Sequence, residues 1–325
     1  MHCSASLASF LARVILLSTI ICFDLVTAVQ AAQPVVPGTG RRISDAGDDF
    51  EDPEWNYVHN LPKSSKNLNE FTGGRSGSSV NGRWYEGMKR GQPDYIKRIS
   101  TPEGGLPGST GSLALMSLQT GVPKRPSYQQ QQDDFICNVM NRVGRIPVSR
   151  VPSAVTRVYL PPVDKWENRT GCHFAFRLAV ETTARKKQKG GLFGGGYKME
   201  NEPYWPGMFI NFDSKEGRGA TGKDSDYAYI RIRGNTRGGD FTGMQIEKTG
   251  WWTLGMSVTG DGMVHYYAKP GVDDLTDEDY ITSQYPYGYR AERFRNFFFN
   301  VCNGDDGRTW STTWIIDDPA FYLAR

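Results

Sequence analysis

The stretch WWTLGMSVTGDGMVHYYA occupies residues 251–268 and consists of two β-rich runs on either side of a Thr-Gly-Asp-Gly turn. Glycine permits the positive φ angles that tight hairpin turns use. In the first run, alternate residues are apolar and fall on one face of an extended chain: Trp252, Leu254, Met256 and Val258. A period of two is that of a half-buried strand. The stretch therefore predicts a β-hairpin with one face in a core.

The same alternation appears in HFAFRLAV (173–180) and in YAYIRIRG (227–234). Seven more short runs are rich in β-branched and aromatic residues, at 112–118, 135–140, 156–161, 207–213, 242–247, 295–302 and 312–323. So many short strands must close their edges or stack as two sheets. The pattern predicts an all-β, two-sheet antiparallel sandwich.

Composition agrees with this fold class. The 325 residues are 38% apolar and 12% aromatic, with 37 Gly and 18 Pro, which favours short strands and tight turns over long helices. The formal charge is only +3 in a chain with 35 acidic residues. Nucleic-acid binding usually requires a clustered basic stripe, so no nucleic-acid partner is expected.

The first 31 residues differ from the rest. Arg13 precedes the apolar run VILLSTIICF, and small residues stand before a cut after Ala31, a pattern typical of a cleaved secretory signal peptide. A membrane anchor is the alternative, but Asp24 leaves the apolar run short of the roughly 20 residues that a spanning helix needs. We expect export to a periplasmic or extracellular location, without membrane attachment after cleavage. Residues 32–47 are expected to be a flexible lead-in, and residues 48–325 a single domain.

Export would leave three cysteines in the mature chain: Cys137, Cys172 and Cys302. They allow one intrachain disulfide, and the sequence does not choose among the three possible pairs. Three buried thiols are the alternative, because free cysteine packs as a small apolar residue.

Four segments together carry a family resemblance. In chain order they are FEDPEW (50–55), GSLALMSL (111–118), the hairpin at 251–268 and WIIDDPAFY (314–322). The chain resembles the concanavalin A-like jelly-roll superfamily over about residues 48–325. The resemblance implies a jelly-roll sandwich that binds or acts on glycans, although a fold alone does not decide function.

The enzyme motifs of that superfamily are incomplete here. The ExDxxE motif, which provides two carboxylates for glycoside hydrolysis, is absent. Resemblance to the polysaccharide lyases implies roles for Arg177, Gln245 and Tyr267, but Glu247 stands where those lyases have a histidine. An anionic group beside an anionic sugar would oppose proton abstraction. His265 is a separate candidate base, with a hydrogen-bonded structural role as its alternative.

We therefore expect a secreted, non-catalytic glycan-binding or extracellular interaction module, with a polysaccharide lyase or other glycan-active enzyme as the alternative. If the outward residues of the central strands share one concave face, six of them would line a glycan groove: Arg177, Asn211, Arg231, Gln245, Trp251 and Tyr267. Hydrogen-bonding and aromatic groups are the mixture that sugars require. A convex solvent face with the same alternation is the alternative reading.

The acidic clusters at the two ends suggest a metal site. If the first and last strands are neighbours, Glu51, Asp52 and Asp317 would come together, and with carbonyls and water they would provide the oxygen ligands that calcium prefers. We expect a structural calcium ion there. The alternative is that these acids accept hydrogen bonds from turn amides.

Overall fold

A computed structural model describes residues 32–64, 76–119, 126–187, 196–220 and 222–325 of this chain. The predicted signal peptide, residues 1–31, lies outside the described residues. The chain from Ala32 to Arg325 forms one compact unit. In the part of the chain that is described, no helix has the length and apolar character needed to cross a membrane.

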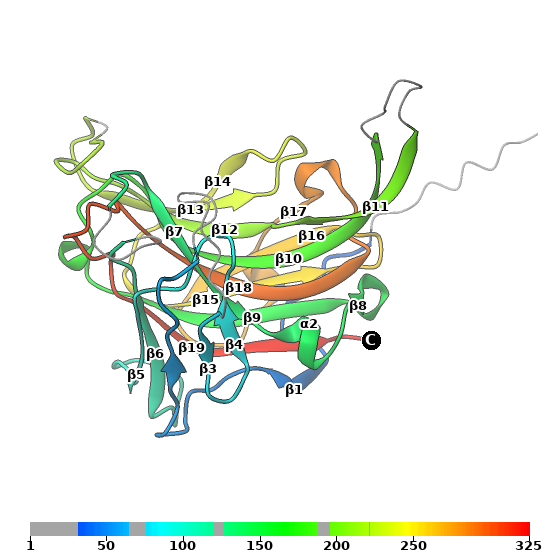
Figure 1. Ribbon diagram of the computed structural model, residues 1–325, viewed down its shortest axis with the longest axis horizontal. Coiled ribbons are helices and arrows are strands. Elements are labelled where there is room, and N and C mark those ends of the chain that lie inside the picture. Colours follow the sequence, from blue (N-terminus) through cyan, green and yellow to red (C-terminus); the bar gives the residue numbers. More distant parts are fainter. Residues whose placement is uncertain (1–31, 65–75, 120–125, 188–195, 221) are drawn as a thin grey trace, which may run out of the picture. The chain divides into compact units, whose positions relative to one another are not determined.

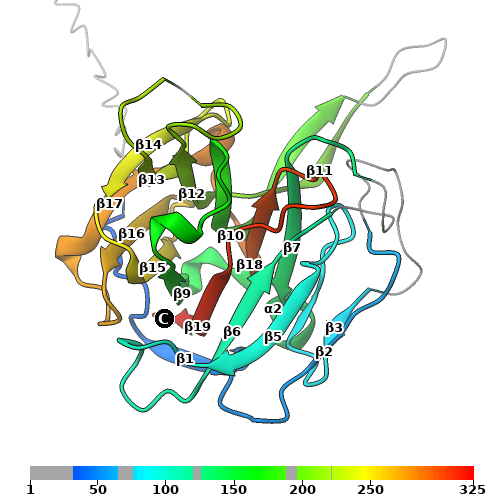
Figure 2. The same cartoon turned by 90° about the vertical axis from the view of Figure 1, so that its left-hand side faces the viewer.

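The first sheet, here called sheet A, has eight strands. In spatial order they are β17 (Tyr280–Gln284), β16 (Val264–Pro270), β15 (Gly250–Val258), β9 (Pro152–Leu160), β19 (Trp314–Leu323), β6 (Gly111–Met116) and β5 (Tyr95–Ser100), and β1 (Arg41–Gly47) also pairs with β19. Figure 2 shows β19 between β9 and β6. The hairpin predicted at 251–268 is confirmed, because β15 and β16 pair in antiparallel register.

The second sheet, sheet B, has eleven strands. In spatial order they are β14 (Asp240–Ile246), β13 (Tyr227–Arg233), β12 (Gly207–Asp213), β10 (Gly171–Lys187), β18 (Arg293–Asn303), β7 (Gln131–Cys137), β4 (Trp84–Glu86), β3 (Ser78–Ser79) and β2 (Tyr57–Val58). Two further strands attach to it, β11 (Tyr197–Tyr204) to β10 and β8 (Ile146–Pro147) to β18. The two-sheet antiparallel sandwich predicted from the sequence is confirmed.

In the segments that the structure describes, helical structure is limited to single turns. These are α2 (Val139–Arg142) and the 3₁₀ turns η1 (Val148–Arg150), η2 (Val163–Lys165), η3 (Asp277–Asp279) and η4 (Pro286–Gly288). The described part of segment 184–203 forms a hairpin arm, since β10 continues to Lys187 and pairs with β11, which projects beyond the sheet in Figure 1.

The core lies between the two sheets and is mostly aromatic on the side of sheet B. Phe174 of β10 stacks on Phe299 of β18, and their ring centroids are 5.7 Å apart. Across the interface, Phe174 also stacks on Trp314 of β19 at 5.1 Å. Aromatic rings bury large areas, so these contacts hold the sheets together. Strand alternation then turns the intervening residues, such as Arg177, onto the outer face of sheet B.

The first and last strands of the described residues are neighbours, which was the condition on which the predicted metal site depended. β1 pairs with β19, and the Asp48 amide donates to the Pro319 carbonyl at 3.0 Å. Residues 41–47, which the sequence assigned to a flexible lead-in, are therefore a sheet strand. The arginine-rich composition did not reveal this, because an edge strand needs only one buried side chain, such as Ile43, to be anchored.

Candidate functional site

A pocket of about 400 Å³ opens on the outer face of sheet B. Its floor is formed by Arg177 of β10, Asp134 of β7 and Phe298 of β18, which are neighbouring strands. Residues 87–90, Trp205 and other loop residues form its walls. Four basic side chains line it together with a single acid among the described residues: Lys89, Arg90, Arg177 and Arg233 against Asp134.

Arg177 is the most constrained of these residues. Only 5% of it is exposed, and its guanidinium lies between the rings of Phe209 and Phe298, 5.1 and 5.3 Å from their centroids. Nη2 donates to the Trp205 carbonyl at 2.6 Å, and Nη1 lies 3.4 Å from the Asn300 Oδ1. Nε has no hydrogen-bond partner among the described residues. The guanidinium is thus fixed in orientation with donor capacity to spare.

The charge of Arg177 is not neutralised by an ion pair. Within the described parts of the chain, no carboxylate oxygen lies within 4.0 Å of its nitrogens. Burial, and to a smaller extent the neighbouring charge of Arg233, together lower the pKa of Arg177 to about 10. The negative charge of Asp134 opposes this shift. Arg177 is still a cation at neutral pH. A buried cation without a paired anion is costly, and an anionic ligand would relieve that cost.

Asp134 is held by amides rather than by cations. Its Oδ1 accepts from Asn300 Nδ2 at 2.6 Å and from Gln132 Nε2 at 3.2 Å. Burial raises the pKa of Asp134, against the effect of Arg90 and other nearby cations. The shift favours the protonated form, which carries no charge to repel an anion.

Of the three other basic side chains that line the pocket, Arg233 and Lys89 differ in their availability to a ligand. Arg233 forms a bidentate ion pair with Asp240, at 2.7 and 2.9 Å. Lys89 is exposed, and its Nζ lies 5.0 Å from the centroid of the Trp205 ring. Lys89 can therefore swing toward a ligand, whereas Arg233 supports the wall.

A second hollow of about 270 Å³ adjoins the pocket and shares Trp205 and Tyr287 with it. Tyr287 has a positive φ of 61°, a conformation that non-glycine residues adopt rarely, and its amide donates to the Asn235 carbonyl at 2.9 Å. The two half-buried rings thus form a boundary with a recess on each side. An extended ligand could contact both recesses.

Four of the six residues predicted to line a glycan groove lie on the outer face of sheet B. They are Arg177 on β10, Asn211 on β12, Arg231 on β13 and Gln245 on β14. Arg177 lines the pocket, whereas Gln245 lines a separate hollow near the edge strand β14. Asn211 is buried, with 6% of its surface exposed.

Trp251 and Tyr267 lie on sheet A, so the six residues do not share one face. Trp251 packs against Ala114 and Ile315, and its Nε1 donates to the Glu103 carbonyl at 3.2 Å. Tyr267 is 1% exposed and packs with Val155 and other residues on the outer side of sheet A. Alternation identified which residues point outward, but it does not tell which of two sheets a strand joins.

The residues that resemble the lyase set are not brought together either. Gln245 and Glu247 line the hollow near β14, and Tyr267 lies on the opposite sheet from Arg177. His265 is also on sheet A and fully buried, where it hydrogen-bonds Thr259 Oγ1 at 2.8 Å and Ser283 Oγ at 2.6 Å. These contacts agree with the alternative hypothesis that His265 has a hydrogen-bonded structural role.

The three acids predicted to bind calcium each accept hydrogen bonds near the junction of the chain ends. Glu51 accepts from the Thr110 amide at 3.0 Å, Asp52 from the Glu54 amide at 2.9 Å, and Asp317 from Ser109 Oγ at 2.9 Å. Among the described residues, no group of three or more His, Cys, Asp or Glu side chains is placed to hold a metal ion. The calcium site stays a prediction, which thermal melts with calcium and with a chelator would test.

Sequence reasoning missed most of the pocket. The strand predicted at 135–140 starts after Asp134, but β7 begins at Gln131. Burial alternates along β7, yet the sequence gives no signal of this, because the buried Gln131 and Asp133 are as polar as the outward Gln132 and Asp134. Trp205 comes from the loop between β11 and β12 and Tyr287 from the 3₁₀ turn η4, and no periodic pattern places residues of loops or single turns.

No protein-family model and no curated protein matches this chain. Among solved structures, it is similar to a GH131 β-glucanase catalytic domain from Podospora anserina, with 12% identity, 86% of this chain and 97% of that chain covered, and a TM-score of 0.43. It is also similar to a carbohydrate esterase from the Shiga toxin-encoding bacteriophage phi24B, with 11% identity, 75% and 91% covered, and a TM-score of 0.40. A third is the VIP36 exoplasmic/lumenal domain in a Ca²⁺/Man3GlcNAc-bound form, with 10% identity, 74% and 84% covered, and a TM-score of 0.34. Similarity at this level of identity and TM-score carries no argument about the function of this chain.

Proposed function

We propose that this chain is a secreted, non-catalytic glycan-binding protein whose pocket on the outer face of sheet B takes an acidic sugar residue. One observation carries the proposal: the Arg177 guanidinium is buried and clamped between two rings, and no carboxylate pairs with it. A carboxylate or sulfate group on a sugar would supply the missing anion and accept charge-assisted hydrogen bonds.

The surroundings of Arg177 favour a glycan over other anions. Trp205 and Tyr287 offer half-buried aromatic faces, on which the apolar side of a sugar ring can stack, beside polar groups that can contact hydroxyls. The adjoining second hollow gives room for a neighbouring sugar of a chain. Nucleic acid is a poorer fit, because the chain has a net charge of only +3 and its basic residues do not form an extended cluster in the sequence.

The pocket supports binding better than turnover. Glycoside hydrolysis requires two matched carboxylates, and Asp134 is the single acid among the described residues that line the pocket. No histidine is among those described lining residues.

The test is a polysaccharide array with three classes of probe: uronate polymers such as polygalacturonate and alginate, sulfated polymers such as chondroitin sulfate, and neutral polymers such as dextran. We expect retention of at least one acidic class, little retention of dextran, and weakening by salt. The ultraviolet absorbance of unsaturated products and the release of reducing ends are followed in the same samples. Retention of only neutral polymers, or of none, would refute the acidic-glycan proposal, and turnover would refute its non-catalytic part.

A further inference from the structure

Two of the three described cysteines lie side by side on the central strands of sheet B. The Sγ atoms of Cys172 on β10 and Cys302 on β18 are 3.8 Å apart, although the residues are 130 positions apart in the sequence. Cys302 is fully buried and Cys172 is half-buried. Next to Cys302, Val301 points into the core, so alternation turns Cys302 outward.

A shift in strand register explains how Cys172 comes to face Cys302. The pairing of β10 with β12 slips between Cys172 and Phe174, so that Phe174 and His173 both contact core rings. Without this irregularity, Cys172 would share the inward direction of Phe174. The irregularity therefore places both sulfur atoms on the outer face.

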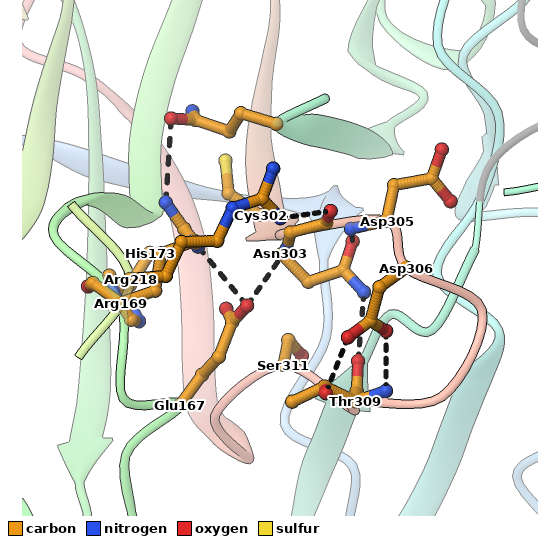
Figure 3. Close-up of polar contacts among 12 residues, drawn as sticks. Glu167, Arg169, His173, Arg218, Cys302, Asn303, Asp305, Asp306, Thr309 and Ser311 are labelled. Atoms are coloured by element: carbon orange, nitrogen blue, oxygen red, sulfur yellow. Dashed lines mark hydrogen bonds and ion pairs between the residues drawn. The ribbon is translucent and has the colours of Figure 1, made fainter. Parts of the chain in front are cut away.

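The backbone at each cysteine is fixed by one polar network, which Figure 3 shows beside Cys302. Arg169 Nη2 donates to the Cys172 carbonyl at 2.7 Å, and Arg169 Nε pairs with Glu167 Oε1 at 3.1 Å. The same Glu167 oxygen accepts from the Gly304 amide at 2.8 Å, two residues after Cys302. A single ion pair thus ties both strand segments together.

The third cysteine is placed differently. Cys137 belongs to the core, and its Sγ accepts from the Gly47 amide at 3.2 Å. Burial raises the pKa of its thiol to about 12, which keeps it protonated and unreactive. Among the three described cysteines, the geometry selects one pair.

We propose that Cys172 and Cys302 are a disulfide-forming pair that small-molecule disulfides, such as oxidised glutathione, convert to a cross-strand bridge. A disulfide requires sulfur atoms about 2.05 Å apart and Cα atoms about 4.4–6.8 Å apart. The antiparallel register of β10 and β18 places Phe174 opposite Val301, so the two cysteines lie on adjacent strands next to this pair. Adjacent strands are about 4.7–4.9 Å apart, a spacing compatible with that Cα range, and the sulfur atoms, now 3.8 Å apart, would have to approach by less than 2 Å.

The chemistry begins at Cys172, the more accessible sulfur. Its thiolate attacks the small disulfide, forms a mixed disulfide and releases one thiolate of the reagent. The Cys302 thiolate then attacks the Cys172 sulfur, forms the protein disulfide and releases the second reagent thiolate. In total, the two protein thiols lose two protons and two electrons and become one disulfide. The reagent disulfide takes up these protons and electrons and becomes two thiols. A hydrogen bond from Cys302 lowers the pKa of Cys172, with help from the charges of Arg169 and Arg177, which favours this order.

The bridge would join the two strands that carry the floor of the pocket, Arg177 on β10 and Phe298 on β18. Its formation does not depend on what the pocket binds. The inference therefore stands or fails separately from the proposed function.

The test is disulfide mapping of the folded chain without the predicted signal peptide, residues 32–325, after incubation with oxidised glutathione. The sample is quenched in acid, denatured, alkylated with iodoacetamide and digested without reduction. We expect one linked peptide pair joining Cys172 to Cys302, lost after dithiothreitol, with Cys137 alkylated. Cys137→Ser should retain the linked pair, whereas Cys172→Ser should lose it and leave Cys302 alkylated. Alkylation of both Cys172 and Cys302 after oxidation, or a link from either to Cys137, would overturn the proposal.

Discussion

Replacement of Arg177 by methionine should separate binding from stability. Methionine keeps an apolar stem of similar length between Phe209 and Phe298 but removes the charge and the donors. Charge-assisted hydrogen bonds contribute about 1.5–3 kcal/mol each, so loss of one corresponds to roughly 10- to 100-fold weaker binding of the acidic glycan. We expect Arg177→Met to lose affinity by at least this amount.

Stability should change little in the same variant. The pKa of Arg177 falls from 12.5 to about 10, which corresponds to about 3 kcal/mol spent on burying the charged group. Against this relief, methionine loses the hydrogen bond to Trp205 and two ring contacts, worth about 1 kcal/mol each. The terms nearly cancel, so the melting temperature should stay within about 3 °C of the wild type.

Calorimetric titration with the acidic polymer that the array selects measures the affinity, and differential scanning calorimetry measures the melting temperature. Arg231→Met is the matched control, because Arg231 lies on the same outer face and carries the same charge but does not line the pocket. The control should bind within about twofold of the wild type. Unchanged affinity in Arg177→Met, or an equal loss in Arg231→Met, would refute the role of Arg177.

Three further changes test the surroundings of the site and the fold. Trp205→Ala should weaken glycan binding by about 1 kcal/mol, roughly fivefold, because the stacking face is lost, and titration should show this without a large change in the melting temperature. Burial lowers the pKa of His265 to about 4, so the folded state holds it neutral while the unfolded state takes up a proton below about pH 6.5. Stability should therefore fall by up to about 3 kcal/mol as the pH drops from 6.5 toward 4, and denaturant titrations of His265→Gln should show a shallower decline; an identical decline would contradict the assignment. Lys63→Met should lower the free energy of unfolding by about 3–5 kcal/mol, because Lys63 Nζ contacts Asp133 at 2.7 Å and Asp94 at 2.8 Å in a buried site; a loss below 1 kcal/mol in urea unfolding would show that the ion pair is dispensable.

The sequence was sufficient to predict the sandwich because the alternation of apolar and polar residues within each strand shows which face is buried and which is exposed. In β13, the alternation of Ala228, Ile230 and Ile232 with polar residues appears unchanged in the burial of the strand. The hairpin of β15 and β16 could also be predicted from the sequence, since its turn and its two strands are adjacent in the chain. Local pattern and local structure coincide in these elements.

The sequence pattern failed where a neighbour decides the outcome. Residues 41–47 look like a polar lead-in, yet pairing with β19 makes them a strand. At Cys172, a slip in register turns the side chain to the face opposite to the one that strict alternation assigns. Neither event has a signal within its own segment, because each depends on hydrogen bonds to a strand far away in the sequence.

The sequence by itself determined that the fold is a two-sheet sandwich and that Arg177 points away from its core. The pairing of the first described strand with the last was only a condition of the predicted metal site, and the structure supplied it. Only the tertiary structure decided which outward residues share a face, because Arg177 and Tyr267 both point outward from different sheets. It also decided the membership of the pocket, since Trp205 from a loop and Tyr287 from the turn η4 line it together with Arg177. The same holds for the cysteine pair, which is 130 positions apart in the sequence but 3.8 Å apart in space. The physical reason is that periodicity reports how one strand is buried, whereas a site is formed by the pairing of strands that are distant in the chain.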